Sequence, residues 1–455
     1  MGSLARAASN HHLDGSSLPA LRNRWLRRRQ DIRMPHHTPR RTRLCSPYGI
    51  DQRHRREQWR GIAGLTVRLA IIRQRYTPYG GAERFVESAL EALLERGVAI
   101  SLYTRQWPNT RLQLIEPVLC NPFYIGRLWR DWSFARAVCG AVAKKAPELV
   151  QSHERLLCCD IYRAGDGVHR VWLDERLRHA SAFKRWQIES SFYHRYLVNV
   201  ERRLFASPWL RAVICNSKMV RDEIHERFGL SLEKLPVIYN AVDSDVFSPE
   251  LRQHRAAVRQ KLGVPESATV FLLVGSGYVR KGVATVIQAM SRLPSDTYLV
   301  VVGRDKSGRR YKRLAEQLGI ARRVALLGAL EDPKPFYGAA DAFVLPTLYD
   351  PCPNAALEAM ACGLPVVTST KSGAAELVIE HDAGLVCEAR DIDALALHMM
   401  TLTDPEARRL LGARAREAVL PLTPASMTLQ LVLLYRDLIA AAVAVRDGDE
   451  KPAAL

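Results

Sequence analysis

Cysteine spacings that hold zinc or build a disulfide framework are missing from this sequence of 455 residues. Its nine cysteines are scattered and odd in number, and no Cys-x-x-Cys pair occurs. The sequence therefore indicates neither a zinc ribbon nor a disulfide-stapled fold. A reducing compartment suits such a chain best.

Long hydrophobic runs are missing as well. No stretch approaches the ~20 uninterrupted apolar residues of a membrane-spanning helix, and the first residues lack the apolar core of a secretion signal. With 47% hydrophobic and 25% charged residues, the composition is that of a soluble globular protein with room for two domains and extensions. We therefore expect a cytoplasmic protein, with the cytoplasmic face of the inner membrane as a second possible place.

Lysine is absent from residues 1–66, which contain fourteen arginines and only four acidic residues. This segment shows no apolar periodicity and is rich in His, Pro and Ser, so we expect a largely disordered basic extension. It is either an arm for nucleic acid or membrane, or an extension without consequence for the fold. The rest of the chain is also basic, which favours an anionic partner such as a phosphorylated substrate, an anionic membrane or nucleic acid.

Short apolar runs alternate with helical patterns through the remaining chain, which predicts an α/β fold with parallel sheets. We divide the chain into a first domain over 67–242, a second over 243–425, a final helix over 426–445 and a tail over 446–455. The strands expected in the first domain are Val67–Ile72, Val98–Tyr103, Glu148–Ser152, Ala212–Cys215 and Leu235–Asn240. Those expected in the second are Val270–Gly275, Tyr298–Val302, Val324–Leu327, Ala342–Leu345 and Val366–Thr368.

A diglycine follows the first strand. Gly80 and Gly81 precede a helix that is expected to begin at about Ala82. A strand, a flexible loop and a helix N-terminus in this order suit an anion, and an ordinary turn is the plain alternative. No Gly-Lys-Ser or Gly-Lys-Thr follows, so this is not a Walker loop.

Further candidate site residues follow later strands of the first domain. His153 comes directly after one strand, and Asp166 lies between two glycines that should expose its carboxylate, with His169 three residues further on. Each of these could equally be a hydrogen-bonded loop residue. Residues 172–205 are helical in pattern and mix basic with aromatic residues. That mixture suits either phosphate groups or a membrane surface, or else a solvated helix that covers the core.

A cationic loop opens the second domain. Ser276 follows the first strand of this domain, and Arg280 and Lys281 stand next to each other where a helix begins. Two adjacent cations at such a junction suit a diphosphate, with a solvated basic turn as the alternative. The preceding string Asp243-Ser244-Asp245 spells a DxD, which we interpret as a cap of the linker because such strings are common by chance.

Two carboxylates, Asp350 and Glu358, stand eight residues apart, one after the strand Ala342–Leu345 and one within the helix that follows. Asn354 lies at the start of that helix. Ligands of open α/β sheets bind outside the carboxyl ends of strands, and helix N-termini attract anions. Taken singly, Asp350 could be a turn residue and Glu358 part of a solvated helix face, but the apolar residues around Glu358 argue against a solvated face.

The stretch Leu345–Glu376, LPTLYDPCPNAALEAMACGLPVVTSTKSGAAE, resembles the E-x7-E signature of retaining family-4 glycosyltransferases with the GT-B fold. Asp350 stands where that family usually has its first Glu, and Glu358 is the second. The loop with Arg280 and Lys281 is similar to a narrower group, the glucosyltransferase I enzymes of lipopolysaccharide core synthesis. The resemblance covers about 67–445 and implies two Rossmann-like domains facing a cleft, with the final helix returning to the first domain.

The resemblance also implies roles for single residues. Asp350 would lie by the donor sugar, and Glu358 would bind the ribose hydroxyls of the nucleotide. Arg280 would supply the guanidinium that the family often carries at the position of Ser276. The nucleotide-sugar site would consist of Gly80, Gly81, Ser276, Arg280, Lys281, Asn354 and Glu358. The catalytic residues would be Asp350, Arg280, Lys281 and Asp166. The acceptor side would be formed by His153, Asp166 and His169. Cations would neutralise the diphosphate, so no metal or other cofactor is expected.

The expected function is retaining transfer of a hexose, most simply glucose from a UDP-sugar, to a lipopolysaccharide-core or other surface-polysaccharide acceptor. The partners would be a nucleotide sugar, an anionic glycolipid and the surface of an anionic membrane, without nucleic acid. Mannosyl transfer from GDP-mannose, a nucleotide-sugar 2-epimerase, and a non-catalytic basic protein that binds nucleic acid or membrane on a degenerate transferase fold stay open as alternatives.

Overall fold

The computed structural model describes residues 68–74, 99–106, 115–178 and 180–449. These residues belong to one structural unit that runs from Leu65 to Leu455. Two sequence-based expectations, the basic extension over residues 1–66 and the loop with Gly80 and Gly81, lie outside the described residues.

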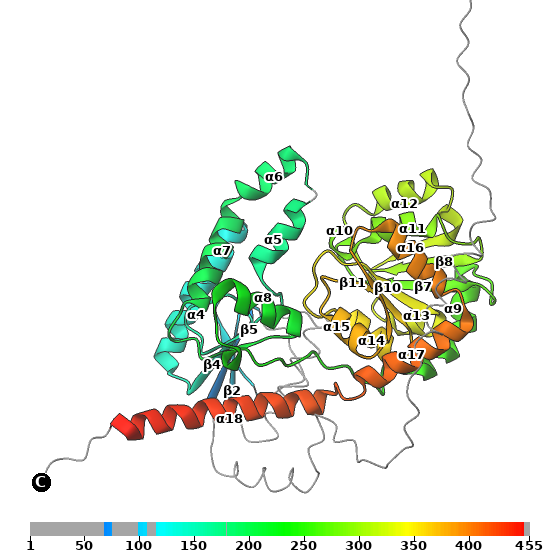
Figure 1. The fold of residues 1–455 in the computed structure, drawn as a ribbon. Helices are drawn as coiled ribbons and strands as arrows, with labels where there is room; N and C mark the ends of the chain where they lie inside the picture. Colours follow the sequence, from blue (N-terminus) through cyan, green and yellow to red (C-terminus); the bar gives the residue numbers. More distant parts are fainter. Residues whose placement is uncertain (1–67, 75–98, 107–114, 179, 450–455) are drawn as a thin grey trace, which may run out of the picture. The chain divides into compact units, whose positions relative to one another are not determined.

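The first domain is built, within the described residues, on a parallel sheet of six strands (Figure 1). In chain order the strands are β1 Arg68–Ile72, β2 Ala99–Thr104, β3 Glu116–Leu119, β4 Leu149–Ser152, β5 Ile161–Arg163 and β6 Ala212–Ile214. Their spatial order is β3-β2-β1-β4-β5-β6, and Ala70 of β1 pairs with Ser101 on one side and Val150 on the other. The winding direction of the chain reverses between β1 and β4, which is where such sheets bind ligands.

The helices of the first domain divide one stretch that the sequence predicted to be helical. They are α4 Gly126–Lys145, α5 His169–Arg178, α6 Ala182–Glu189, α7 Phe192–Phe205 and α8 Lys218–Phe228, with a 3-10 turn at Leu232–Lys234. The expected helical stretch 172–205 is thus divided among three helices. Ser191 separates the last two, because its hydroxyl accepts a hydrogen bond from His194 N and so caps α7.

The strand expected over Leu235–Asn240 was a wrong prediction. The segment forms only an isolated parallel bridge between Val237 and Cys215. Ile238 N donates to Cys215 O, and Cys215 N donates to Pro236 O. A longer ladder is hindered because Pro236 has no N–H to contribute.

The second domain, as described over residues 243–449, contains another parallel sheet of six strands. They are β7 Thr269–Val274, β8 Thr297–Val302, β9 Val324–Gly328, β10 Ala342–Leu345, β11 Val366–Ser369 and β12 Gly384–Cys387, in the order β12-β11-β10-β7-β8-β9. The connecting helices are α9 Arg255–Leu262, α10 Tyr278–Lys281, α11 Val283–Met290, α12 Gly308–Gln317, α13 Lys334–Ala339, α14 Asn354–Ala361, α15 Ala374–Glu380, α16 Ile392–Thr401 and α17 Pro405–Val419. Here the chain reverses between β7 and β10.

Each sheet has its own hydrophobic core. Phe271 on β7 and Phe343 on β10 are fully buried, as is Val213 on β6. Helices cover the sheets of both domains (Figure 1), so central strands are buried on both faces and appear in the sequence as continuous apolar runs. The prediction of an α/β fold with two Rossmann-like domains is confirmed.

The last helix, α18 Pro424–Asp449, contacts the first domain. Tyr435 OH donates to Gln151 Oε1 on β4 at 2.7 Å, and the Arg211 guanidinium donates to Leu438 O. The helical stretch Pro405–Ala441 is long and apolar enough, by length and composition, to cross a membrane. Met427, Leu431 and Tyr435 are nevertheless buried against protein, so this face of α18 is a packing surface.

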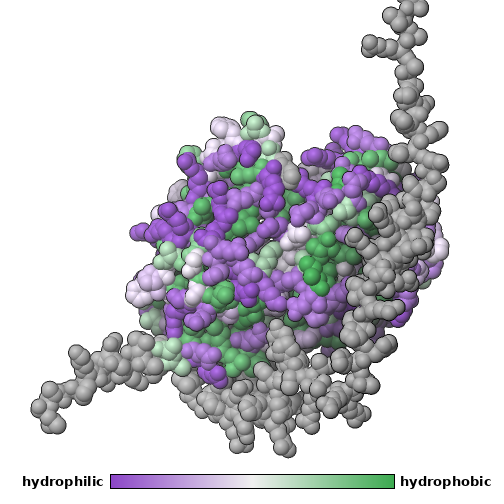
Figure 2. All heavy atoms as spheres, viewed as in Figure 1, coloured by the Kyte–Doolittle hydropathy of each residue, from purple (hydrophilic) through white to green (hydrophobic). Residues whose placement is uncertain are grey.

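A disulfide joins Cys139 of α4 to Cys158, although the cysteine spacings of the sequence indicated no disulfide framework. The two Cα atoms are 5.7 Å apart, although 19 residues separate them in sequence. That spacing matches no motif, and the pair becomes visible only when α4 packs beside the segment after β4. On the face seen in Figure 2, hydrophilic residues dominate the described surface, with hydrophobic residues in small groups between them.

Candidate functional site

The strand order of the second sheet brings two loops together. β7 and β10 are parallel neighbours, with Phe271 opposite Ala342 and Leu272 opposite Phe343. Their carboxyl ends therefore lie at the same edge of the sheet. The loop over 275–282 follows β7 and the loop over 346–353 follows β10, so the cationic segment and Asp350 meet at the reversal point.

A buried ion-pair cluster forms where these loops meet. Asp350 Oδ2 lies 2.5 Å from Lys281 Nζ and 3.0 Å from Arg280 Nη1. The side chains of Asp350 and Lys281 are about one-tenth exposed or less, whereas that of Arg280 is 39% exposed. One carboxylate thus holds two cations, and the exposed guanidinium leaves the cluster with a positive charge open to solvent.

The cluster keeps Asp350 ionised. Burial raises the pKa of this carboxyl, but the charges of Lys281 and Arg280 outweigh burial and hold the pKa below its ordinary value. Burial lowers the pKa of Lys281, and the attraction of Asp350 opposes that shift. The contacts support the lowered pKa of Asp350, because Lys281 and Arg280 both contact the same carboxylate oxygen.

Two glycines shape the segment that carries Lys281. A Cβ on Gly275 would lie 2.8 Å from Lys281 Cε, and a Cβ on Gly282 would lie 2.2 Å from Pro346 O. Gly282 also has a φ of +73°, which a side chain rarely adopts. The Lys281 side chain therefore packs on Gly275, and the turn at Gly282 packs against the loop that carries Asp350.

The second carboxylate is held from another helix. Glu358 on α14 is half-buried, and its Oε2 accepts a hydrogen bond of 2.7 Å from Tyr337 OH on α13. Tyr337 is 1% exposed, so this contact fixes the direction of the carboxylate. Tyr337 could not be predicted from the sequence, because no motif surrounds it. Its contact with Glu358 appears only in the structure, where α13 and α14 lie close together.

Asn354, at the start of α14, belongs to a polar network that sequence reasoning also missed. Its Oδ1 accepts from Asn240 Nδ2 at 2.6 Å, and the same amide donates to Cys352 O at 3.1 Å. Arg163 Nη2 in turn donates to Asn240 Oδ1 at 2.8 Å. The network links the end of β5 in the first domain to the first turn of α14.

The remaining predicted residues of the second domain occupy loops near the cluster. Ser276 Oγ accepts from Arg304 N at 3.0 Å. Asp350 N donates to Lys371 O, and Gly373 N donates to Asp350 O, both at 2.9 Å. The loop over 370–373, between β11 and α15, is thus attached to Asp350 by its backbone. Glu376, in the first turn of α15, accepts from Lys218 N at 2.8 Å and Met219 N at 3.0 Å, and so caps α8 of the first domain.

His153 and Asp166 lie in different environments. His153 is half-buried, with Nε2 3.2 Å from Gln151 Nε2. Burial, reinforced by the charges of Arg73 and Arg163, lowers the pKa of this imidazole well below its usual range, so the ring is neutral. Asp166 is exposed in the turn before Gly167. A Cβ on Gly167 would meet Tyr349 OH at 2.2 Å, which places this turn against the residue that precedes Asp350.

His169 lies inside the packing of the first domain. It is 9% exposed, its N donates to Glu201 Oε1 at 2.8 Å, and its Nε2 is 3.1 Å from His194 Nδ1. Burial, together with nearby Arg155, lowers its pKa to about 3. The structure thus brings Arg280, Lys281 and Asp350 into contact. It holds Asn354 and Glu358 on α14, the helix that follows Asp350. It places the His169 side chain, at the start of α5, against α7.

The string Asp243-Ser244-Asp245 forms a cap, as the sequence indicated. Asp243 Oδ1 accepts from Asp245 N at 3.0 Å and from Val246 N at 3.1 Å. Across the described ranges, no group of three or more His, Cys, Asp or Glu side chains is arranged to hold a metal. Metal independence of the reaction stays a prediction.

Comparison with known proteins identifies the class. Residues 79–246 match the family Glycosyltransferase Family 4, and residues 254–418 match the family Glycosyl transferases group 1. The two matches cover both domains, and the chain belongs to the glycosyltransferases with the GT-B fold. The resemblance inferred from Leu345–Glu376 is confirmed.

Individual relatives narrow the likeness further. The lipopolysaccharide glucosyltransferase WaaG of Escherichia coli (strain K12) is 25% identical over 324 residues, which cover 70% of this chain and 84% of the relative. The crystal structure of WaaG, a glycosyltransferase involved in lipopolysaccharide biosynthesis, matches with a TM-score of 0.68 at 22% identity, over 79% of this chain and 98% of that one. Anabaena Alr3699/HepE, in a complex with UDP and glucose, matches with a TM-score of 0.61 at 20% identity, over 82% of this chain and 100% of that one. The two structural matches show the shared fold.

Proposed function

We propose that this glycosyltransferase moves a hexose, glucose in the first instance, from a UDP-sugar to a lipopolysaccharide-core or other surface-polysaccharide acceptor, with retention of configuration. The observation that carries the proposal is the cluster of Lys281, Arg280 and Asp350 at the reversal point of the second sheet. Cations at that edge suit a diphosphate. The relationship to a lipopolysaccharide glucosyltransferase supports the class of acceptor.

In the proposed reaction, the bond between the anomeric carbon and the diphosphate oxygen breaks. The acceptor oxygen forms its new bond to the same carbon on the same face, and the acceptor proton passes to the departing phosphate oxygen. Lys281 and Arg280 stabilise the charge that develops on the diphosphate. Glu358 accepts hydrogen bonds from the ribose hydroxyls, and Asp166, exposed on its turn, orients the acceptor hydroxyl.

The test is a transfer assay with the full chain. The protein is incubated with UDP-glucose or GDP-mannose and a purified core oligosaccharide, with and without EDTA. Mass spectrometry identifies the product, and NMR gives its anomeric configuration. We expect glucosyl transfer with retention that persists in EDTA. Transfer of mannose alone, epimerised sugar formed without acceptor, or loss of activity in EDTA with rescue by manganese would each overturn the corresponding part of the proposal.

Peripheral contact with an anionic membrane is the second part of the proposal. Phe123, Ile125 and Trp129 at the start of α4 are 74%, 68% and 41% exposed, and Arg127 stands among them. Exposed aromatic and aliphatic side chains beside a cation are typical of helices that lie on membrane interfaces. In sedimentation with vesicles, we expect binding to phosphatidylglycerol that Trp129→Ala weakens. Equal binding to pure phosphatidylcholine would contradict the role of charge.

A further inference from the structure

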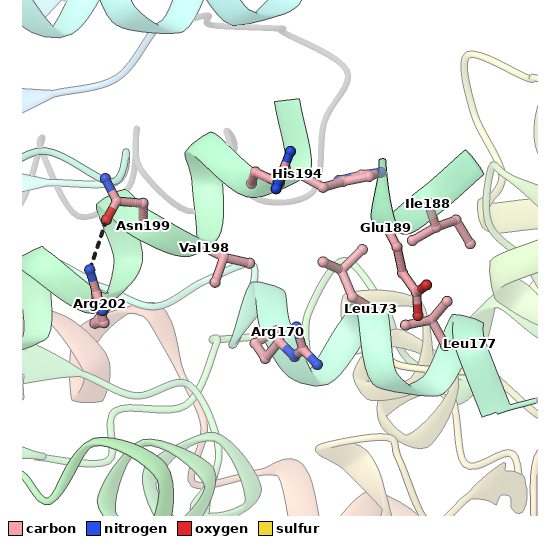
Figure 3. A pocket seen from close by; sticks show the side chains of 10 residues that line it. Arg170, Leu173, Leu177, Ile188, Glu189, His194, Val198, Asn199 and Arg202 are labelled. Carbon is pink, nitrogen blue, oxygen red and sulfur yellow. Dashed lines mark hydrogen bonds between the residues drawn. The ribbon is translucent and has the colours of Figure 1, made fainter. Parts of the chain in front are cut away.

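A cavity of about 310 Å³ lies between α5, α6 and α7, and shares no lining residue with the Lys281–Asp350 cluster (Figure 3). Its apolar lining comes from three helices: Leu173 from α5, Ile188 from α6 and Val198 from α7. Leu173 and Ile188 are buried, and Val198 is half-buried. The cavity is at the small end of the range for ligand sites, which begins near ~300 Å³.

The walls of this cavity are held in place by buried polar contacts. Glu201 of α7 is 1% exposed, and it accepts hydrogen bonds from His169 N at 2.8 Å and Arg170 N at 3.3 Å at the start of α5. The imidazoles of His169 and His194 bridge the same two helices at 3.1 Å. Because both contacts join α5 to α7, the cavity is formed before any ligand arrives.

The rim of the cavity carries an excess of positive charge. Its lining includes Arg170, Arg195 and Arg202 against a single carboxylate, Glu189. Arg170 pairs with Asp174 at 3.0 Å. Among the described residues, neither Arg195 nor Arg202 has a carboxylate within ion-pair distance. Arg202 Nη2 donates to Asn199 Oδ1 at 3.2 Å (Figure 3). Because that partner is neutral, the charges of both exposed guanidiniums on α7 are available to an outside anion.

We propose that this cavity binds a phosphate-bearing sugar unit of the glycolipid acceptor. The inference rests on the proposed glycosyl transfer, and adds a site for a part of the acceptor that does not react. Guanidiniums bind phosphate in a bidentate way, which suits Arg195 and Arg202. The C–H face of a sugar ring packs on Leu173 and Val198, and its hydroxyls find Asn199 on the same wall. A volume of about 310 Å³ accommodates one such unit and no more of the chain.

The position of α5 links the cavity to the acceptor side. α5 begins at His169, directly after the turn that carries Asp166, and Val168 N donates to Tyr349 OH at 2.9 Å next to Asp350. An acceptor that places its phosphorylated unit in the cavity would extend along α5. The first turn of α5 adjoins the loop that carries Asp350.

The experiment measures binding of core oligosaccharide by calorimetry, before and after treatment with alkaline phosphatase. For the Arg195→Ala/Arg202→Ala double variant we expect affinity for the phosphorylated form to fall roughly tenfold or more, because charge-assisted contacts are lost. Arg203→Ala is the matched control: Arg203 is exposed on the same helix and lies outside the cavity lining. It should change affinity less than ~2-fold. Val198→Trp, which fills the cavity, should weaken binding as well.

Binding of UDP is measured in parallel, so failure of the donor proposal is recognised separately. UDP affinity should be the same in all these variants, since none of them touches the cluster. Unchanged oligosaccharide affinity in the double variant, an equal loss in Arg203→Ala, or equal binding of the dephosphorylated form would overturn the inference. Free glucose 6-phosphate binding more tightly than the oligosaccharide would overturn the acceptor as its source.

Discussion

At the scale of single residues, Lys281 is the most constrained cation of the site. It is 6% exposed, lies over Gly275 and contacts Asp350. We expect Lys281→Ala and Arg280→Ala each to cost about 2–4 kcal/mol of transition-state stabilisation, because a contact to the leaving diphosphate is lost. The measurement is kcat/KM with UDP-glucose, with the exposed Lys261→Ala on α9 as a control that keeps wild-type activity. Near-normal turnover in both site variants would exclude the assignment.

Glu358 and Tyr337 form a pair that can be tested together. Glu358→Gln removes the charged acceptor proposed for the ribose hydroxyls and should weaken UDP affinity by roughly 1–3 kcal/mol. Tyr337→Phe removes only the hydroxyl that donates to Glu358 at 2.7 Å. It should weaken affinity less, by about 0.5–1.5 kcal/mol. Calorimetry with UDP measures both affinities. A larger loss of UDP affinity in Tyr337→Phe than in Glu358→Gln would show that Tyr337 does not act through Glu358.

Asp350 gives a prediction about pH. The neighbouring cations hold the pKa of this carboxyl below its ordinary value of 3.8. A lowered pKa in the folded state means that the ionised group stabilises the fold above about pH 4, and that this contribution is lost as pH falls through the lowered pKa. The free energy of unfolding of wild type should therefore exceed that of Asp350→Asn at pH 7, and the difference should shrink toward pH 3. A difference that grows on acidification would contradict the ionised assignment.

At the scale of elements, the turn between α10 and α11 is set by Gly282. Gly282→Ala places a Cβ 2.2 Å from Pro346 O at a φ of +73°. We expect a loss of about 2–4 kcal/mol of folding stability, from the left-handed backbone and the clash together. Gly263→Ala is the control: its φ is +65°, with nothing within 4 Å of the added Cβ. It should cost only about 1–2 kcal/mol. Thermal unfolding of both variants gives the comparison, and equal losses would show that the clash relaxes.

The elements also show how far the sequence leads. The strands β7, β8, β10 and β11 were predicted within a residue or two, because strands buried on both faces are continuous apolar runs. β3 and β5 were not predicted. β3 begins with Glu116-Pro117 at an edge, and β5 has three residues, so neither presents a pattern to detect. Contacts between distant segments, such as Tyr337 with Glu358 or Cys139 with Cys158, cannot be recognised from the spacing of residues in the sequence. They appear only in the packed structure.

At the scale of the whole molecule, the sequence led to the fold and the family because the residues proposed to bind the donor, Arg280, Lys281 and Asp350, lie in two short loops of one domain. Lys281 and Asp350 are 69 residues apart, but the strand order of a doubly wound sheet brings the ends of β7 and β10 together in any such domain. The residues proposed for the acceptor side follow no such rule. His153 and Asp166 lie in loops, and His169 begins α5. The contacts of His169 come from α7, whose position beside α5 the sequence does not show, so they could not be predicted in the same way.

The basic extension is the last feature to be tested at this scale. The structural unit that holds both sheets runs from Leu65 to Leu455, and the first strand among the described residues is β1 Arg68–Ile72. Deletion of residues 1–64 should therefore leave the unfolding temperature and kcat/KM close to those of the full chain, since no strand of the first sheet is removed. The same pair of proteins is compared for sedimentation with vesicles of phosphatidylglycerol and for retention on a nucleic-acid column. Loss of vesicle binding with intact turnover would assign the extension to membrane attachment, and a large drop in unfolding temperature would show instead that it packs on the core.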